Sequence, residues 1–123
     1  MDSEKLAELA AEACDDRKAK NINMIHIRKV SSLADWIVIA EGLSDVNVRA
    51  IIDSVEEKLK IRADRLPLRC EGLNEAKWAL LDYGELIINV LQPYEREYYD
   101  IESFWSHGEK RIYASSNGLI DKS

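Results

Sequence analysis

Few side chains in this sequence are suited to acid–base or metal chemistry, and they stand far apart. The two histidines, His26 and His107, are separated by most of the chain and lack metal-ligand spacing. His26 lies in a predicted strand, where a histidine is more often packed than a ligand. The sequence contains no phosphate-binding loop, GxGxxG fingerprint, HExxH motif or recognisable Ser-His-Asp set. These types and spacings therefore give little support to an enzyme.

Three carboxylates are the remaining candidates for a catalytic or metal site: Asp35, Asp82 and Glu85. They fall near predicted strand ends, where α/β sheets tend to place their chemistry. Asp35 could equally bond backbone amides in its turn, and the other two could solvate a hairpin tip. We favour that structural interpretation. The alternative is a nucleotide- or metal-binding enzyme in which Asp35 and Asp82 hold a divalent metal.

The composition bounds the class of protein. A chain of 123 residues, 46% hydrophobic and 33% charged, predicts one domain with its own core. No stretch approaches the roughly 20 apolar residues of a membrane span, and the acidic beginning is unlike a signal or transit peptide, so we expect a cytoplasmic location. Cys14 and Cys70 have no CxxC spacing and fit a reducing compartment. The net charge of −6 argues against general nucleic-acid binding and suits a basic partner.

Hydrophobic periodicity predicts the element order α-β-β-α-β-β-β-α. We expect a helix over 3–19 capped by Ser3, strands over 24–30 and 36–40, and a second helix capped by Ser44. Pro67 indicates that residues 66–71 are an edge strand or the approach to one. Pro93 begins a last helical segment that breaks near Asp100. The predicted fold is α/β (α+β), a mixed β-sheet of about five strands with helices mainly on one face. A single domain over 1–107 would precede a polar, flexible tail over 108–123.

The stretch WALLDYGELIINVL, residues 78–91, predicts a β-hairpin that turns at Gly84. Trp78, Leu80 and Asp82 share one face of its first arm, because side chains alternate along a strand. Amphipathic helices can cover one face of the hairpin, but little chain remains for the other. An exposed apolar patch of that kind usually marks an interface. Alternatively, the C-terminal aromatic segment YEREYYDIESFW folds back over it.

Two charged clusters add to this picture. A basic cluster follows the second helix and is either a solvated loop or a local contact with phosphates. An acidic-aromatic strip lies near the C-terminus. Aromatic residues at helical spacing usually belong to a core, but tyrosines beside carboxylates also suit a basic partner. The basic cluster comprises Lys58, Lys60, Arg62, Arg65 and Arg69, and the strip comprises Asp100 and Glu102 with Tyr94, Tyr98, Tyr99, Phe104 and Trp105.

Three stretches resemble one family: SSLADWIVIAEGLSDVNVRAI (31–51), EGLNEAKWALLDYGELIINVL (71–91) and REYYDIESFW (96–105). Their residues and spacing are similar to those of the Iojap-related ribosomal silencing factors of bacteria and organelles, over about residues 4–106. There are departures. Glu41 stands where a small polar residue is usual, Asn89 and Leu91 replace the usual His and Phe, and the family's acidic-alanine ending is missing.

The resemblance implies a fold related to the nucleotidyltransferases without their catalytic motif, no enzyme activity and no cofactor. It implies binding to the large ribosomal subunit through ribosomal protein L14, which would block association with the small subunit and repress translation. It also implies a homodimer when the protein is free, and allows minor contact between the basic cluster and ribosomal RNA. The partner-binding residues that it implies are Trp78, Leu80, Asp82, Tyr83 and Gly84, with Glu71, Arg96, Tyr98 and Asp100 at the rim.

Overall fold

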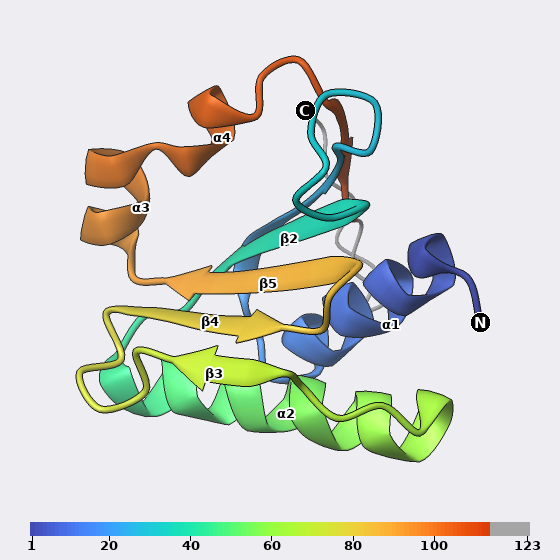
Figure 1. Cartoon of the computed structure of the whole chain (residues 1–123). Coiled ribbons are helices and arrows are strands. Elements are labelled where there is room, and N and C mark those ends of the chain that lie inside the picture. The colour runs from blue at the N-terminus through green and yellow to red at the C-terminus, as the bar shows by residue number, and fades with distance from the viewer. Residues whose placement is uncertain (114–123) are drawn as a thin grey trace.

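The computed structural model describes residues 1–113 and is built around one mixed sheet (Figure 1). The six strands lie in the order β3-β4-β5-β2-β1-β6, so the predicted mixed sheet is confirmed with one strand more than expected. The elements in chain order are α1 (Ser3–Asp16), β1 (Lys20–His26), β2 (Trp36–Glu41), α2 (Asp45–Ala63), β3 (Arg69–Glu71), β4 (Trp78–Asp82), β5 (Leu86–Leu91), α3 (Pro93–Tyr99), α4 (Ile101–Phe104) and β6 (Glu109–Ile112).

The centre of the sheet is the parallel pair β2 and β5. Their register runs from Trp36 opposite Leu86 to Glu41 opposite Leu91. Both strands are almost continuously apolar and buried, as expected for strands covered on both faces. The other strand pairs are antiparallel, including the predicted hairpin of β4 and β5.

Helices α1 and α2 cover one face of the sheet and form the larger part of the core with it. Asp2, rather than the predicted Ser3, caps α1 by accepting a hydrogen bond from the amide of Lys5 at 2.9 Å. Ser44 caps α2 as predicted, accepting from the amide of Asn47 at 3.0 Å. The apolar stripe of α2 is fully buried, which confirms the helical spacing found in the sequence.

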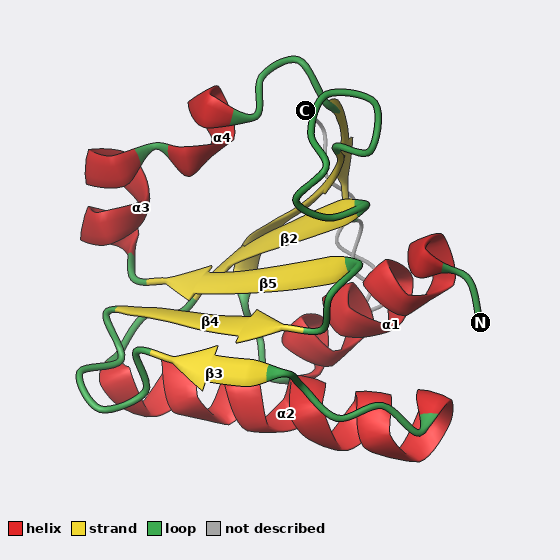
Figure 2. Cartoon of the chain, viewed as in Figure 1, coloured by secondary structure: helices red, strands yellow, loops and turns green. Residues whose placement is uncertain are grey.

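The opposite face carries a second, smaller apolar cluster formed by residues of β1, β2, β5 and the connection between β1 and β2. Ile101 and Trp105 pack against this cluster from the C-terminal segment, and Trp78 and Leu80 extend it onto β4. Figure 2 shows α3 and α4 set apart from α1 and α2. The alternative in which the aromatic segment folds back is thus realised over the middle of the sheet, while Trp78, Leu80 and Asp82 on β4 stay half exposed.

Three predicted boundaries were wrong. The first helix ends at Asp16 rather than at residue 19. The first strand spans Lys20–His26 rather than 24–30, because the chain turns directly after it: the amides of Val30 and Ser31 both bond the carbonyl of Ile27. Part of the predicted tail is also strand, since β6 pairs with β1 from Asn23 opposite Ile112 to His26 opposite Glu109. The sequence EKRI has no buried residue and hence no apolar signal. The rest of that tail, residues 114–123, lies outside the described residues.

Candidate protein-docking surface

The strand register brings the predicted face of the hairpin together. Trp78, Leu80 and Asp82 alternate with the buried Ala79 and Leu81, as the sequence pattern predicts. Towards the sheet edge, Leu80 lies opposite Glu71 and Asp82 lies opposite Arg69 on β3. The result is a half-exposed surface on β3 and β4, apolar at one end and charged at the other.

Trp78 is held in one orientation by contacts on two sides. Its indole Nε1 donates to Oδ1 of Asn89 at 3.0 Å, and Asn89 itself is buried. Its ring lies 5.0 Å from that of Tyr99, tilted by 47°. An aromatic side chain that is already fixed loses little conformational entropy when a partner covers it. Trp78 therefore has the geometry of an interface anchor.

Asp82 is not a free carboxylate. It accepts a hydrogen bond from Nε of Arg69 at 3.1 Å and another from the amide of Gly84 at 2.8 Å. Arg69 also contacts Glu71. A cation on a partner would therefore join an existing charged group at this end of the face.

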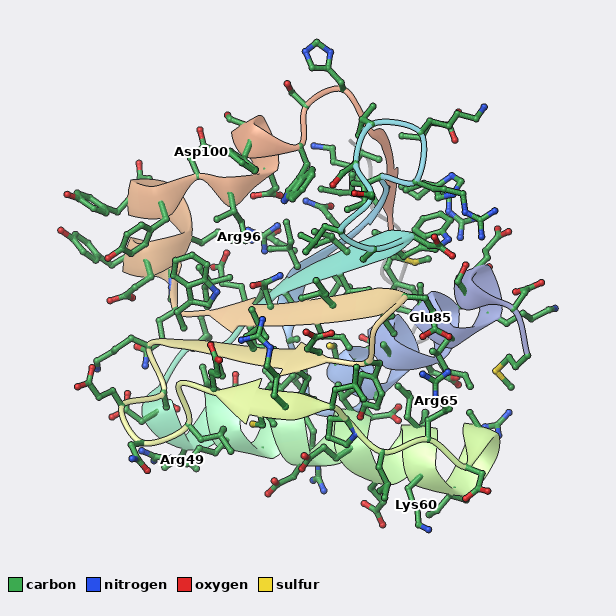
Figure 3. The ribbon with its side chains drawn as sticks, viewed as in Figure 1. Arg49, Lys60, Arg65, Glu85, Arg96 and Asp100 are labelled. Carbon is green, nitrogen blue, oxygen red and sulfur yellow. The ribbon has the colours of Figure 1, made fainter. Side chains whose placement is uncertain are left out.

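The hairpin tip is shaped by Tyr83 and Gly84 as expected, but Tyr83 points away from the docking face. Its side chain is 1% exposed, and its buried hydroxyl has no hydrogen-bond partner among the described residues. Arg65 secures the tip with a bidentate contact to Glu85 at 2.8 and 2.9 Å and a bond to the carbonyl of Tyr83 at 2.9 Å (Figure 3). The hydrogen bond from Arg65 lowers the pKa of Glu85.

Arg96 is also inside the fold, not at the rim where the sequence reasoning placed it. It is 8% exposed and makes a two-pronged contact with Glu102 at 2.7 and 3.2 Å. It further donates to the carbonyl of Asn21 at 2.5 Å and lies 3.6 Å from Glu41. Burial raises the pKa of Glu102, but contacts with Arg96 and Asn23 outweigh it and the net pKa is lowered. Arg96 thus attaches α3 and α4 to the sheet.

The outer side of α3 and α4 exposes aromatic rings next to the hairpin. Tyr94 stacks on Tyr98 with centroids 5.8 Å apart, Tyr98 meets Tyr99 edge-on, and Phe104 is 78% exposed. Tyr99 joins this surface to Trp78. The i, i+4 spacing of Tyr94 and Tyr98 was the sequence signal for a shared helix face. The sequence analysis placed Tyr99 in the strip that suits a basic partner, but not among the residues of the hairpin docking face.

Most of the basic cluster is neutralised within the protein. Lys58 lies 2.6 Å from Asp16, and Lys60 lies 3.8 Å from Asp64. With Arg65 and Arg69 bound as described above, Arg62 alone in the cluster has no ion pair among residues 1–113. The local positive charge available to a phosphate is therefore small.

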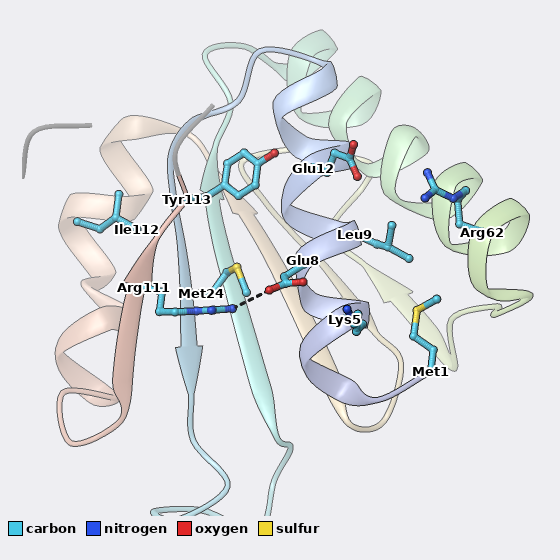
Figure 4. A pocket seen from close by; sticks show the side chains of 10 residues that line it. All are labelled: Met1, Lys5, Glu8, Leu9, Glu12, Met24, Arg62, Arg111, Ile112 and Tyr113. Atoms are coloured by element: carbon cyan, nitrogen blue, oxygen red, sulfur yellow. Dashed lines mark hydrogen bonds and ion pairs between the residues drawn. The ribbon is translucent and has the colours of Figure 1, made fainter. Parts of the chain in front are cut away.

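Arg62 lines a hollow of about 590 Å3, together with residues of α1 and β6. Figure 4 shows this hollow over α1 and beside β6, with Arg111 directed towards Glu8. Arg111 pairs with both Glu4 and Glu8, at 3.2 and 3.3 Å. The sheet order places it at the edge away from the hairpin, so it is separate from the docking face.

The carboxylates nominated for an enzyme are engaged with arginines. Arg28 donates two hydrogen bonds to the carboxylate of Asp35, at 3.1 and 2.8 Å, and thereby lowers the pKa of that carboxyl. Asp82 is bound to Arg69 on another part of the sheet. Within the described residues, no group of His, Cys, Asp and Glu is arranged to hold a metal. Burial raises the pKa of Cys14 to about 12, which keeps that thiol protonated at neutral pH.

A mixed sheet that presents a fixed, half-exposed tryptophan beside exposed aromatics is typical of a protein-binding domain. Comparison with known proteins gives the family. The family described as ribosomal silencing factor during starvation (RsfS) matches residues 1–122. The chain therefore belongs to the ribosomal silencing factor family, as the three quoted stretches indicated.

Individual relatives agree with this assignment. Ribosomal silencing factor RsfS of Chromobacterium violaceum is 35% identical over 114 residues, which cover 93% of this chain and 92% of the relative. The same-named protein of Zymomonas mobilis is 35% identical over 120 residues, covering 98% and 90%. Mouse mitochondrial assembly of ribosomal large subunit protein 1 is 28% identical over 91 residues, covering 72% and 40%.

Solved structures share the fold. A crystal structure of a Chromobacterium violaceum protein matches with a TM-score of 0.84 and 35% identity, covering 96% of this chain and 97% of that one. A Bacillus halodurans structure matches with a TM-score of 0.73 and 31% identity, covering 84% and 95%. In the described part of this chain, no helix is long and apolar enough to cross a membrane.

Proposed function

We propose that this protein binds the large ribosomal subunit through ribosomal protein L14 and sterically blocks association with the small subunit, which represses translation. Membership of the silencing-factor family supports a role on the ribosome. The name of the mouse relative connects that protein with the large subunit. The observation that carries the proposal is the half-exposed Trp78, fixed by Asn89 on the part of this face that the C-terminal segment leaves open.

In this proposal Trp78 is the anchor and Leu80 fills apolar surface beside it. Asp82, together with Arg69, meets polar groups of the partner at the charged end of the face. Tyr83 and Gly84 set the shape of the tip without exposing the phenol, and Arg96 positions α3 and α4. Exposed residues complete the rim: Glu71, Tyr98 and Asp100.

Charge supports the same partner class. The chain has a net charge of −6, and ribosomal proteins are generally basic, so complementary charge would accelerate encounter. The internal pairing of the basic cluster makes contact with ribosomal RNA a minor part of the proposal. The action requires no catalysis and no cofactor. A cytoplasmic location fits it, and a homodimer of the free protein would compete for the same apolar face.

Cosedimentation with purified ribosomal subunits tests the proposal. We expect the protein to pellet with large subunits and not with small ones. Added before mixing, it should also slow subunit joining, which light scattering measures. Binding to neither subunit contradicts the proposal. The alternative, a nucleotide- or metal-binding enzyme, is tested by calorimetry with nucleotide and magnesium. We expect no heat of binding, and a measurable heat would support the enzyme instead.

A further inference from the structure

A hollow of about 700 Å3 lies beside Trp78, and the proposed docking contacts leave it unused. The loop between β3 and β4 lines one part of it, and Glu95 and Tyr99 of α3 line another. Trp78 and Tyr99 line it with their rings 5.0 Å apart. The hollow is therefore continuous with the apolar docking face and has an aromatic wall.

The charges that line this hollow are unbalanced. Glu75 and Glu95 line it, and neither makes a hydrogen bond or ion pair with any described residue. Lys77 also lines it, but its ammonium group lies 3.0 Å from Asp45, which already compensates its charge. The uncompensated charge is negative. Aromatic faces and carboxylates together attract a cation.

The loop that forms the hollow is held by side chains from elsewhere in the fold. Arg49 of α2 donates to the carbonyls of Leu73 and Asn74 at 3.0 and 2.6 Å (Figure 3). The amide of Gln92 donates to the carbonyl of Ala76 at 3.0 Å. A hollow with a fixed wall loses little free energy to ordering when a ligand enters.

We propose that this hollow binds the guanidinium group of an arginine side chain presented by the docked protein. A planar guanidinium can lie against the Trp78 and Tyr99 rings while its N–H groups reach the two glutamates, a geometry that an ammonium group does not match. The protein already contains one such pairing, because the guanidinium carbon of Arg111 lies 5.2 Å from the centre of the Trp36 ring. The inference rests on the proposed function for its partner, but the chemistry of the hollow can be tested alone.

The test uses three blocked tripeptides, Ala-Arg-Ala, Ala-Lys-Ala and Ala-citrulline-Ala, added to the full chain while indole N–H resonances are followed by NMR. Citrulline keeps the shape of arginine but has no charge. We expect the arginine peptide alone to shift the Trp78 resonance in a saturable way, with Trp36 and Trp105 as internal references. The variant Glu75→Gln/Glu95→Gln should lose the shift. The control Asp53→Asn/Glu57→Gln removes the same number of negative charges from exposed positions on α2. It should keep the shift of the Trp78 resonance.

No shift with the arginine peptide, an equal shift with citrulline or lysine, or an unchanged shift in Glu75→Gln/Glu95→Gln would each overturn the inference. Cosedimentation separates this result from the proposed function. A chain that pellets with large subunits but shows no arginine selectivity keeps its proposed function and loses the guanidinium site. A chain that selects arginine but pellets with neither subunit keeps the site and loses the proposed function.

Discussion

The indole Nε1 of Trp78 donates a hydrogen bond to Oδ1 of Asn89, 3.0 Å away on the neighbouring strand. Asn89 lies opposite Leu80 in the β4–β5 register, so the bond runs diagonally across the hairpin. It satisfies a buried amide oxygen and fixes a half-exposed aromatic ring in one step. Asn89 thus orients the proposed anchor.

Truncation of this anchor should abolish most of the binding. Trp78→Ala removes a central aromatic group, which costs more than about 2 kcal/mol in interfaces of this kind, or about 30-fold in affinity. Lys60→Ala changes an exposed residue outside the face and should bind like the wild type. Cosedimentation with large subunits at a series of concentrations measures both. Equal losses would move the interface towards the basic cluster and RNA.

Gly72 should tolerate a side chain much less well than Gly84. A Cβ on Gly72 would lie 2.1 Å from the carbonyl oxygen of Trp78, and its φ is +85°. Gly72→Ala should therefore lower the free energy of unfolding by more than about 2 kcal/mol. Gly84 has φ +94°, but a Cβ there would make only an ordinary van der Waals contact, 3.6 Å from Leu68. Gly84→Ala should therefore cost only backbone strain of about 1–2 kcal/mol. Urea unfolding compares the two, and a smaller loss at Gly72 would contradict the close approach.

The Arg96–Glu102 pair should be costly to break on one side and cheap to replace as a whole. Arg96→Ala leaves the half-buried Glu102 without its partner and should destabilise the protein by about 3–5 kcal/mol. Replacing both residues by leucine removes the unpaired charge and should recover much of that loss. Thermal unfolding of the single and double variants measures the difference. A double variant no more stable than Arg96→Ala would show that the remaining contacts of Arg96 dominate.

The Arg65–Glu85 contact should give part of the stability a dependence on acidic pH. Because Arg65 lowers the pKa of Glu85 below its ordinary 4.5, the unfolded chain takes up this proton first as the pH falls. The contribution is therefore complete above about pH 5 and is lost as the pH falls through 4.5 towards the lower folded pKa. Urea unfolding at several pH values should show a shallower acid loss for Glu85→Gln. The control Glu57→Gln, exposed on α2, should follow the wild type.

Removal of β6 should weaken the fold even though its side chains are exposed. A chain that ends at residue 107 loses the pairing of β6 with β1 and the contacts of Arg111 with Glu4, Glu8 and Trp36. We expect a lower midpoint of thermal unfolding for this chain. A chain that ends at Tyr113 keeps all of these contacts and is the matched control. Equal midpoints for the two would show that β6 contributes nothing to stability.

Local pattern was enough for the parts of this fold whose burial follows a regular period. The alternation in residues 78–91 predicted the hairpin and its faces, and the apolar stripe of α2 predicted its buried side. Pro67 and Pro93 marked an edge strand and a helix start because proline lacks the amide that those positions do not use. The quoted stretches were sufficient to predict the family.

Long-range contacts decided the rest. From the sequence, Arg96 and Tyr98 were both predicted to lie at the rim of the docking face. The packing of α3 and α4 on β1 and β2 buries Arg96 and leaves Tyr98 exposed. The strand β6 has no apolar period and exists because β1 offers an unpaired edge to it. The elements and the apolar hairpin face depend on neighbours a few residues apart, so they could be predicted from the sequence. The neutralised charges and the hollow lined by Trp78, Tyr99, Glu75 and Glu95 could not, because those residues come from distant parts of the chain and only folding brings them together.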